Sequence, residues 1–230
     1  RCVVIGSNKS AHDISMALWE AGAEVTMIQR SSTLVVKSAA LMELGFGSSY
    51  SEQAVRGGLD HNRADLLFAS IPYGLMPKLH KPVYEAMAKR DAAFYERLRA
   101  AGFLLDWGDD HSGLFVKYLR RGSGSYIDTG ASELIADGEI KLRSGVTIKE
   151  IKRRSVELSD GSEIAADLIV HATGYQPMNA WAARLISPEV ADKIGPCWGL
   201  GSGTTGDCGP WEGELRNIWK PTRQDNLWFH

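Results

Sequence analysis

One stretch of the chain decides its fold: VVIGSNKSAHDISMALWEAGAEVTMIQRSS, from Val3 to Ser32. Residues 2–6 form a short apolar run, which is typical of a buried parallel strand. Apolar residues at helical spacing follow, and Gly22 stands where a helix commonly ends. Residues 25–28 then form a second apolar run. The order of strand, turn, helix and strand predicts half of a βαβ unit.

The turn after the first strand has the position of a phosphate-binding turn in a Rossmann-type unit. In the G-x-G-x-x-G pattern the first glycine makes the turn, the second admits a pyrophosphate and the third lets helix and strand pack closely. Asn at the second position tolerates positive φ, its amide can donate to a phosphate, and a lysine adds charge at a helix N-terminus, where anions bind. We expect pyrophosphate contacts here, although a plain βα turn explains the motif about as well. The six positions are Gly6, Ser7, Asn8, Lys9, Ser10 and Ala11.

The end of the second strand indicates which dinucleotide the turn would hold. A site for NAD usually has Asp or Glu there, which binds the ribose 2′-hydroxyl. A guanidinium instead suits a 2′-phosphate, by charge and by its parallel N–H groups, and serine hydroxyls can add donors. We therefore predict NADPH rather than NADH, against the plainer interpretation of a surface arginine after a strand. The residues in question are Gln29, Arg30, Ser31 and Ser32.

Other polar residues of the chain have structural interpretations that we prefer. Ser10, with Asp13 three residues on, predicts a cap for the first helix. His171 lies in an apolar run and is expected to be a core histidine. The scattered histidines lack metal-ligand spacing, and the absence of G-x-S-x-G and Walker A patterns argues against a hydrolase or a P-loop enzyme. We predict no metal site and assign no catalytic residue.

Residues 38–125 are mostly helical in character and are expected to be an insertion in the nucleotide domain. The clearest helix is predicted over residues 81–102, with Pro82 near its start and Gly102 after its end. Its apolar residues recur near one face, and the charges between them are expected to face solvent.

The last part of the chain returns to strands and then changes composition. Residues 127–172 offer several short strands, and the Asp160-Gly161 pair is a strong signal for a hairpin. Residues 173–230 are rich in Gly, Pro and Trp. Within them, residues 199–213 are expected to form a long ordered loop, and residues 227–230 to begin a strand. We expect the chain to be part of a longer protein, since compact domains rarely begin and end inside strands.

Composition limits the classes of partner. The chain has 230 residues, 44% of them hydrophobic, and a net charge of −2 with no long basic run. We therefore expect neither a nucleic-acid nor a membrane partner. The three cysteines, Cys2, Cys197 and Cys208, are widely spaced and include no C-x-x-C pair. Such sparse cysteine usage is typical of a reduced, cytoplasmic setting.

Three segments together resemble the NADPH-binding half of the flavin-containing monooxygenases. These are GSNKSAHDI, GAEVTMIQRSS and ADLIVHATGY. The most telling piece is the ATGY tetrapeptide, which in that family ends the nucleotide domain and leads the chain back to the FAD domain. The resemblance extends over essentially the whole chain. It implies that the tetrapeptide lies on the nicotinamide side and at the domain junction, through Ala172, Thr173, Gly174 and Tyr175.

The resemblance implies an α/β fold. Residues 1–172 would form a Rossmann-like NADPH-binding domain with a parallel sheet, the helical insertion and a β-meander. Residues 173–230 would be a partial return segment of the FAD domain. The family's FAD-binding GxGxxG lies N-terminal to everything in this chain. The intact protein would reduce FAD with NADPH and, through a C4a-hydroperoxyflavin, insert one atom of molecular oxygen into a small organic substrate.

Two other functions remain open at this point. A flavin disulfide reductase of related fold would need a redox cysteine pair, which this chain lacks. A stand-alone NADP(H)-binding module without activity of its own would suit the chain as it is given. A docking surface for the missing FAD domain would appear as an exposed apolar patch within residues 176–230. Five of the seven tryptophans contribute to that expectation: Trp181, Trp198, Trp211, Trp219 and Trp228.

Overall fold

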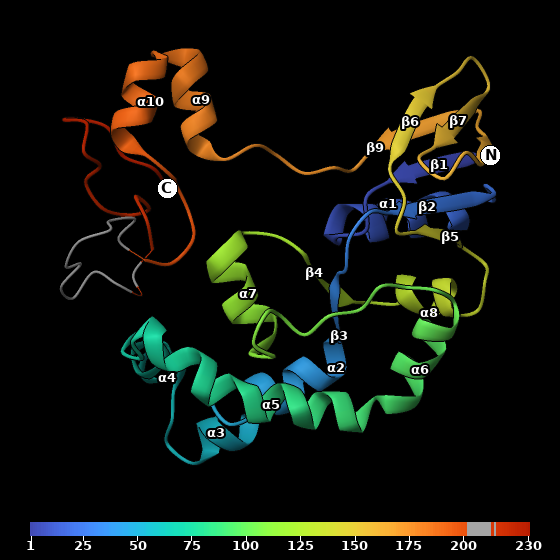
Figure 1. The fold of residues 1–230 in the computed structure, drawn as a ribbon. Coiled ribbons are helices and arrows are strands. Elements are labelled where there is room, and N and C mark those ends of the chain that lie inside the picture. Colours follow the sequence, from blue (N-terminus) through green and yellow to red (C-terminus); the bar gives the residue numbers. More distant parts are fainter. Residues whose placement is uncertain (202–212, 214) are drawn as a thin grey trace.

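The computed structural model describes residues 1–201, 213 and 215–230. Its centre is a sheet of four parallel strands, which confirms the expected α/β class. Each strand of this sheet is four or five residues long. Their spatial order is β5 (Lys141–Ser144), β2 (Val25–Gln29), β1 (Cys2–Ile5) and β9 (Leu168–His171) (Figure 1).

The first strand, helix and second strand form as predicted. The helix α1 (Lys9–Glu20) connects β1 to β2, and its apolar side packs on the core around Val4 and Met27. It ends at Gly22 (φ +83°), whose N–H donates to Trp19 O at 2.8 Å. Glycine reaches this left-handed conformation without a Cβ penalty.

The start of α1 differs from the prediction. The N-cap is Asn8, and Ser10 lies inside the first turn. The proposed capping by Ser10 with Asp13 is therefore wrong. The helix therefore begins two residues earlier than the prediction placed it.

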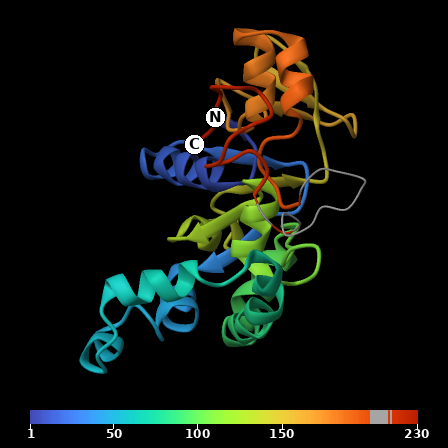
Figure 2. The same cartoon turned by 90° about the vertical axis from the view of Figure 1, so that its left-hand side faces the viewer.

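The insertion is helical, as expected, and extends away from the sheet (Figures 1 and 2). The strands that flank it were not predicted, because β3 and β4 pair in parallel with each other as a separate two-stranded sheet. The elements are β3 (Leu34–Lys37), α2 (Ser38–Ala40), the π-helical turn η1 (Leu41–Phe46), α3 (Glu52–Arg56), α4 (His61–Ala69), the 3₁₀ turn η2 (Tyr73–Leu75), α5 (Met76–Arg90), α6 (Ala92–Ala100), α7 (Gly113–Arg121) and β4 (Ser125–Asp128).

The single helix predicted over residues 81–102 is in fact two. α5 begins at Met76, so that Pro82 lies inside it, and Asp91 separates it from α6. The expected end at Gly102 (φ +87°) is confirmed. Pro82 is the seventh residue of α5, beyond its first turn, so the helix lacks the hydrogen bond that an N–H at this position would make.

Residues 127–172 contain the expected β-meander and one helix that was not expected. β6 (Ile148–Ile151), β7 (Ser155–Leu158) and β8 (Glu163–Ala165) are antiparallel neighbours. The Asp160-Gly161 turn joins β7 to β8, with Leu158 N–H donating to Ser162 O at 2.9 Å, which confirms the hairpin. α8 (Ala131–Ala136) precedes β5.

The strand β9 is the exposed edge of the main sheet. His171 at its end is exposed, so the expectation of a core histidine is wrong. An apolar run does not require burial, and in β9, which pairs with β1 at the edge of the sheet, both Leu168 and His171 are exposed.

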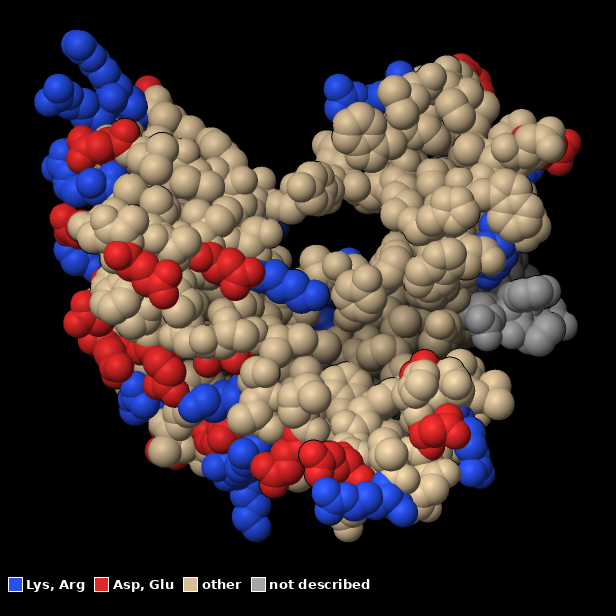
Figure 3. Space-filling view, turned by 180° about the vertical axis from the view of Figure 1, so that it is seen from behind, with Lys and Arg blue, Asp and Glu red and all other residues tan. Residues whose placement is uncertain are grey.

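An extended segment leads from β9 to the last helices, α9 (Met178–Leu185) and α10 (Pro188–Ile194) (Figure 1). Figure 3 shows an opening between this part of the molecule and the sheet, and few charged side chains over the C-terminal part. Residues 227–230 form no strand, contrary to the prediction. Cys208, Trp211 and most of the predicted loop at 199–213 lie outside the described residues.

Several large apolar side chains of the C-terminal segment are exposed. Tyr175 is 98% exposed and Leu185 is 75% exposed. Trp181, Ile186, Trp219 and Trp228 are each about half exposed or more. The described cysteines, Cys2 and Cys197, are buried free thiols. Among the helices that the structure describes, none is long and apolar enough to cross a membrane.

Candidate functional site

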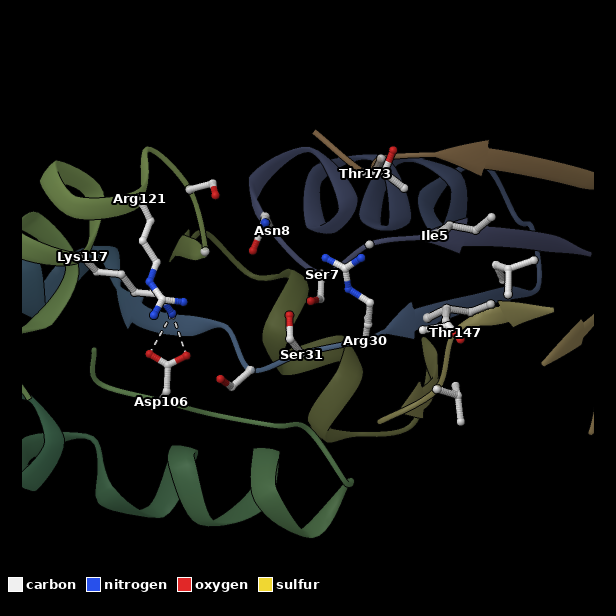
Figure 4. Close-up of a pocket in the computed structure, with 18 of the residues that line it drawn as sticks. Ile5, Ser7, Asn8, Arg30, Ser31, Asp106, Lys117, Arg121, Thr147 and Thr173 are labelled. Atoms are coloured by element: carbon white, nitrogen blue, oxygen red, sulfur yellow. Dashed lines mark hydrogen bonds and ion pairs between the residues drawn. The ribbon is translucent and has the colours of Figure 1, made fainter. Parts of the chain in front are cut away.

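A cavity of about 500 Å³ opens at the carboxyl ends of β1, β2 and β9 (Figure 4). Ligands of open parallel sheets bind at this edge. The turn after β1, the residues after β2, the helix α7 and the end of β9 all reach it. Its lining includes Gly6, Ser7, Asn8, Arg30, Ser31, Ser32, Asp106, Asp109, Lys117, Arg121, Thr147, Ala172 and Thr173.

Gly6 directly follows β1 and begins the turn that leads to α1. Its N–H donates to Ile28 O at 2.9 Å, and its φ is +128°. A Cβ at this position would lie 2.3 Å from the carbonyl oxygen of Ala172. Only glycine therefore allows β1, β2 and β9 to close together at this edge of the sheet.

The N-terminus of α1 faces the turn without a side-chain cap. Its first hydrogen bond runs from His12 N–H to Asn8 O at 3.1 Å. The N–H groups of Lys9, Ser10 and Ala11 thus have no acceptor within the helix. The lysine ammonium lies 5.6 Å from the ring centre of Tyr118. Such free donors, at the positive end of the helix dipole, suit an anion.

Asn8 is held by its neighbours rather than by a special backbone conformation. Its φ is −96°, so the tolerance of positive φ invoked from the sequence is not needed. The Thr33 hydroxyl donates to Asn8 Oδ1 at 3.5 Å and lies 2.8 Å from Ser7 Oγ. With its oxygen engaged in this way, the Asn8 amide keeps its N–H groups for other acceptors.

Arg30 projects into the cavity, on the side of the turn that carries Ser7 (Figure 4). Its side chain is exposed. Within the part of the chain that the structure describes, its guanidinium has no hydrogen-bond or ion-pair partner. Ser31 and Ser32, also exposed, follow it along the cavity wall.

Gln29 lies elsewhere. Its side chain is fully buried, donates to Leu104 O at 3.0 Å and accepts from Leu104 N–H at 2.7 Å. Ser144 Oγ donates to the same amide oxygen at 3.2 Å. The Gln29 amide thus joins β2 to the insertion, and Gln29 is not among the residues that line the cavity.

Only two of the four residues of the ATGY segment line the cavity. Ala172 and Thr173 line it, whereas Gly174 and Tyr175 lie outside it and are exposed. Lys9, Ser10 and Ala11 are also outside the lining, although their backbone N–H groups point to the same helix end.

The insertion contributes charged residues that sequence analysis missed. Asp106 accepts from Lys117 Nζ at 2.7 and 2.6 Å and from Gly108 N–H at 2.8 Å. Arg121 pairs with Asp109 at 2.9 Å. No local pattern marks these residues in the sequence, because a parallel bridge between Thr33 and Leu105 brings them to the cavity.

The pKa of Asp106 reflects two opposing effects. Partial burial acts to raise it. The hydrogen bonds from Lys117, Gly108 and Ser32 favour the charged form more strongly, so that the pKa is lowered from its usual value. Asp106 is therefore a carboxylate at neutral pH.

The described residues contain no group of three or more His, Cys, Asp or Glu that could hold a metal ion. The donors that surround the cavity fit a dinucleotide instead. Backbone N–H groups at the start of α1 and a guanidinium without a partner among the described residues both suit phosphates.

No family model matches the chain, and a search of curated proteins gives no match. Solved structures with some likeness include the open form of a cyclohexanone monooxygenase, with a TM-score of 0.48 and 15% identity over 80% of this chain and 42% of that chain. A cyclohexanone monooxygenase variant from Rhodococcus sp. Phi1 bound to NADP+ gives 0.47 and 15%, over 80% and 41%. The ornithine hydroxylase from Pseudomonas aeruginosa gives 0.37 and 16%, over 84% and 40%.

The chain thus spans about two fifths of the length of these proteins. All three are monooxygenases or hydroxylases by name. At TM-scores below 0.5 the likeness is loose.

Proposed function

We propose that the cavity binds NADPH. The observation that carries the proposal is the guanidinium of Arg30, which has no partner among the described residues and shares a cavity with the Gly6 turn. The pyrophosphate would lie against the turn and the free N–H groups of α1, and the adenosine 2′-phosphate against Arg30. The hydroxyls of Ser31 and Ser32 would add donors to that phosphate.

Ala172 and Thr173 would border the nicotinamide end, since they close the cavity from the side of β9. Gly174 and Tyr175 would mark the passage to another domain. The exposed position of Tyr175, together with the exposed Trp181 and Leu185, suits a surface that another part of the protein covers.

For the intact protein we propose an FAD-dependent monooxygenase that acts on a small organic substrate with molecular oxygen. When bound, the flavin supplies the chemistry, by accepting a hydride from NADPH and reacting with oxygen. We assign the Gly6 turn, which lines the cavity before the uncapped start of α1, to the pyrophosphate of NADPH. FAD would be held mainly by a domain outside this chain, while the residues of this chain bind NADPH and orient it.

The alternatives differ in flavin and thiol chemistry. A stand-alone NADP(H)-binding module would bind NADPH without any flavin-dependent oxidation. A disulfide reductase would need paired cysteines, whereas Cys2 and Cys197 are separate buried free thiols.

The test is calorimetric titration of the chain with NADPH and with NADH. We expect tighter binding of NADPH, and a loss of about 10- to 100-fold in its affinity in Arg30→Ala, because a charge-assisted bond to phosphate is removed. Arg99→Ala is the matched control, since this exposed arginine lies on α6 away from the cavity. Equal affinities of wild type and Arg30→Ala for NADPH would refute the proposed phosphate contact.

A further inference from the structure

We propose that Asp106 and Lys117 together set the cofactor preference of the cavity. In this proposal, Lys117 neutralises a carboxylate that would otherwise repel a 2′-phosphate. The inference rests on the proposed binding of NADPH and concerns the choice between NADPH and NADH.

The first step is the position of the carboxylate. Leu105 forms a parallel bridge with Thr33, and Asp106 N–H donates to Thr33 O at 3.4 Å. The Ser32 side chain also hydrogen-bonds the Asp106 carboxylate. Asp106 therefore lies beside the residues that follow β2. In sites for NAD this is where a carboxylate binds the ribose 2′-hydroxyl.

The sequence has no acidic residue at the end of β2, but the fold supplies one. Asp106 follows Arg30 by 76 positions (106 − 30) and reaches the same cavity through the insertion. The cavity thus contains the acceptor typical of an NADH site and the guanidinium typical of an NADPH site. Which of the two dominates depends on what neutralises the acid.

The second step is the geometry of Lys117. Its ammonium lies 2.7 and 2.6 Å from the two carboxylate oxygens of Asp106. Its side chain is 7% exposed, against 23% for Asp106. A Cβ at Gly124 would lie 2.7 Å from Lys117 Cε, so the lysine stem packs directly on that glycine. The lysine is therefore held in place before any ligand arrives.

The third step is the balance of charge. Arg121 is paired with Asp109, and Lys117 with Asp106. Of the charged residues that line the cavity among those described, Arg30 alone remains unpaired, and the net charge favours a phosphate. Because the Lys117–Asp106 pair is largely buried, salt screens it less than a surface pair.

Replacing Lys117 and replacing Asp106 should change the preference for NADPH over NADH in opposite directions. Lys117→Met leaves a bare carboxylate that repels the 2′-phosphate and accepts a bond from the 2′-hydroxyl of NADH. Asp106→Asn leaves the lysine as a second cation for the phosphate. The double variant Asp106→Asn with Lys117→Met carries neither charge and is expected to resemble the wild type.

The experiment measures Kd for NADPH and NADH by calorimetry on the wild type and these three variants. We expect the ratio Kd(NADH)/Kd(NADPH) to fall about tenfold in Lys117→Met and to rise at least about threefold in Asp106→Asn. Arg120→Met is the control. It removes a paired cation from the same helix, but Arg120 pairs with Asp110 and does not line the cavity.

The outcomes separate this inference from the proposed function. A folded wild-type chain that binds neither nucleotide overturns both. If the wild type prefers NADPH and a folded Lys117→Met variant has an unchanged Kd ratio, the role proposed for the Asp106–Lys117 pair is refuted and the proposed binding of NADPH stands. If Lys117→Met does not fold, Asp106→Asn decides: a raised ratio supports the proposal and an unchanged one overturns it.

Discussion

The carbonyl oxygen of Ala172 stands 2.3 Å from the point that a Cβ on Gly6 would occupy. This relationship joins the end of β9 to the turn after β1. Any side chain at position 6 must push these two strand ends apart, and it must also adopt a φ of +128°.

We expect Gly6→Ala to lower the free energy of unfolding by about 2 kcal/mol or more and to abolish NADPH binding. Chemical denaturation and calorimetry measure the two effects. Gly74→Ala is the control, since a Cβ there meets nothing within 4 Å. A Gly6→Ala variant with wild-type stability would show that the approach of the strands is looser than described.

Burial makes His12 a source of pH-dependent stability. The ring is fully buried, stacks on Tyr126 with ring centres 4.0 Å apart, and donates from Nδ1 to Asn8 O at 3.1 Å. Burial lowers the pKa of His12 to about 4. Between pH 6.5 and 4 the unfolded chain therefore binds a proton that the folded chain does not.

Because the folded pKa is lowered, stability falls as pH drops through this window and the loss levels off below pH 4. We expect the wild type to lose about 3 kcal/mol relative to His12→Phe between pH 7 and pH 4. The phenylalanine keeps the stacking but does not titrate. Urea titrations at several pH values test this, and parallel pH profiles of the two proteins would contradict it.

Gln29 is expected to act on stability and not on cofactor choice. Gln29→Leu removes the bonds to Leu104 and leaves polar backbone groups without partners, at a cost of about 1–3 kcal/mol. Gln53→Leu, on the exposed face of α3, is the matched control. If Gln29→Leu leaves stability unchanged but alters the preference for NADPH, Gln29 takes part in cofactor binding instead.

The exposed apolar side chains near α9 are expected to make the isolated chain associate. Replacing Trp181, Leu185 and Ile186 by serine removes much of the apolar surface at the end of that helix. Sedimentation velocity over a range of concentrations should show association of the wild type and less of it in the variant. A wild type that stays monomeric at every concentration would argue against a docking surface there.

The sequence predicted the parts of the fold that depend on local pattern. The turn at Gly6, the helix end at Gly22 and the hairpin at Asp160-Gly161 each follow from a residue whose backbone preference is specific. The β3–β4 pair was missed because parallel pairing joins Leu34 to Ser125, and no short-range signal specifies such a partner.

The residues of the candidate site likewise include some that a local pattern indicates and others that depend on the tertiary fold. Arg30 was predicted because it follows a strand at a fixed distance from Gly6. Asp106 and Lys117 were not predicted, since their place depends on how the insertion folds back. The buried position of the Gln29 side chain was not predicted, because one residue along a strand turns a side chain to the opposite face.

The helix α7 serves two parts of the molecule at once (Figure 1). Lys117 and Arg121 face the cavity, while Leu119 packs with Leu215 and Ile218, and the Tyr118 carbonyl accepts from Trp198 Nε1 at 2.8 Å. The contacts that hold the C-terminal segment and two of the charged residues that line the cavity therefore lie on the same helix. If a ligand changes the free energy with which that segment docks, the segment changes the ligand's affinity by the same amount.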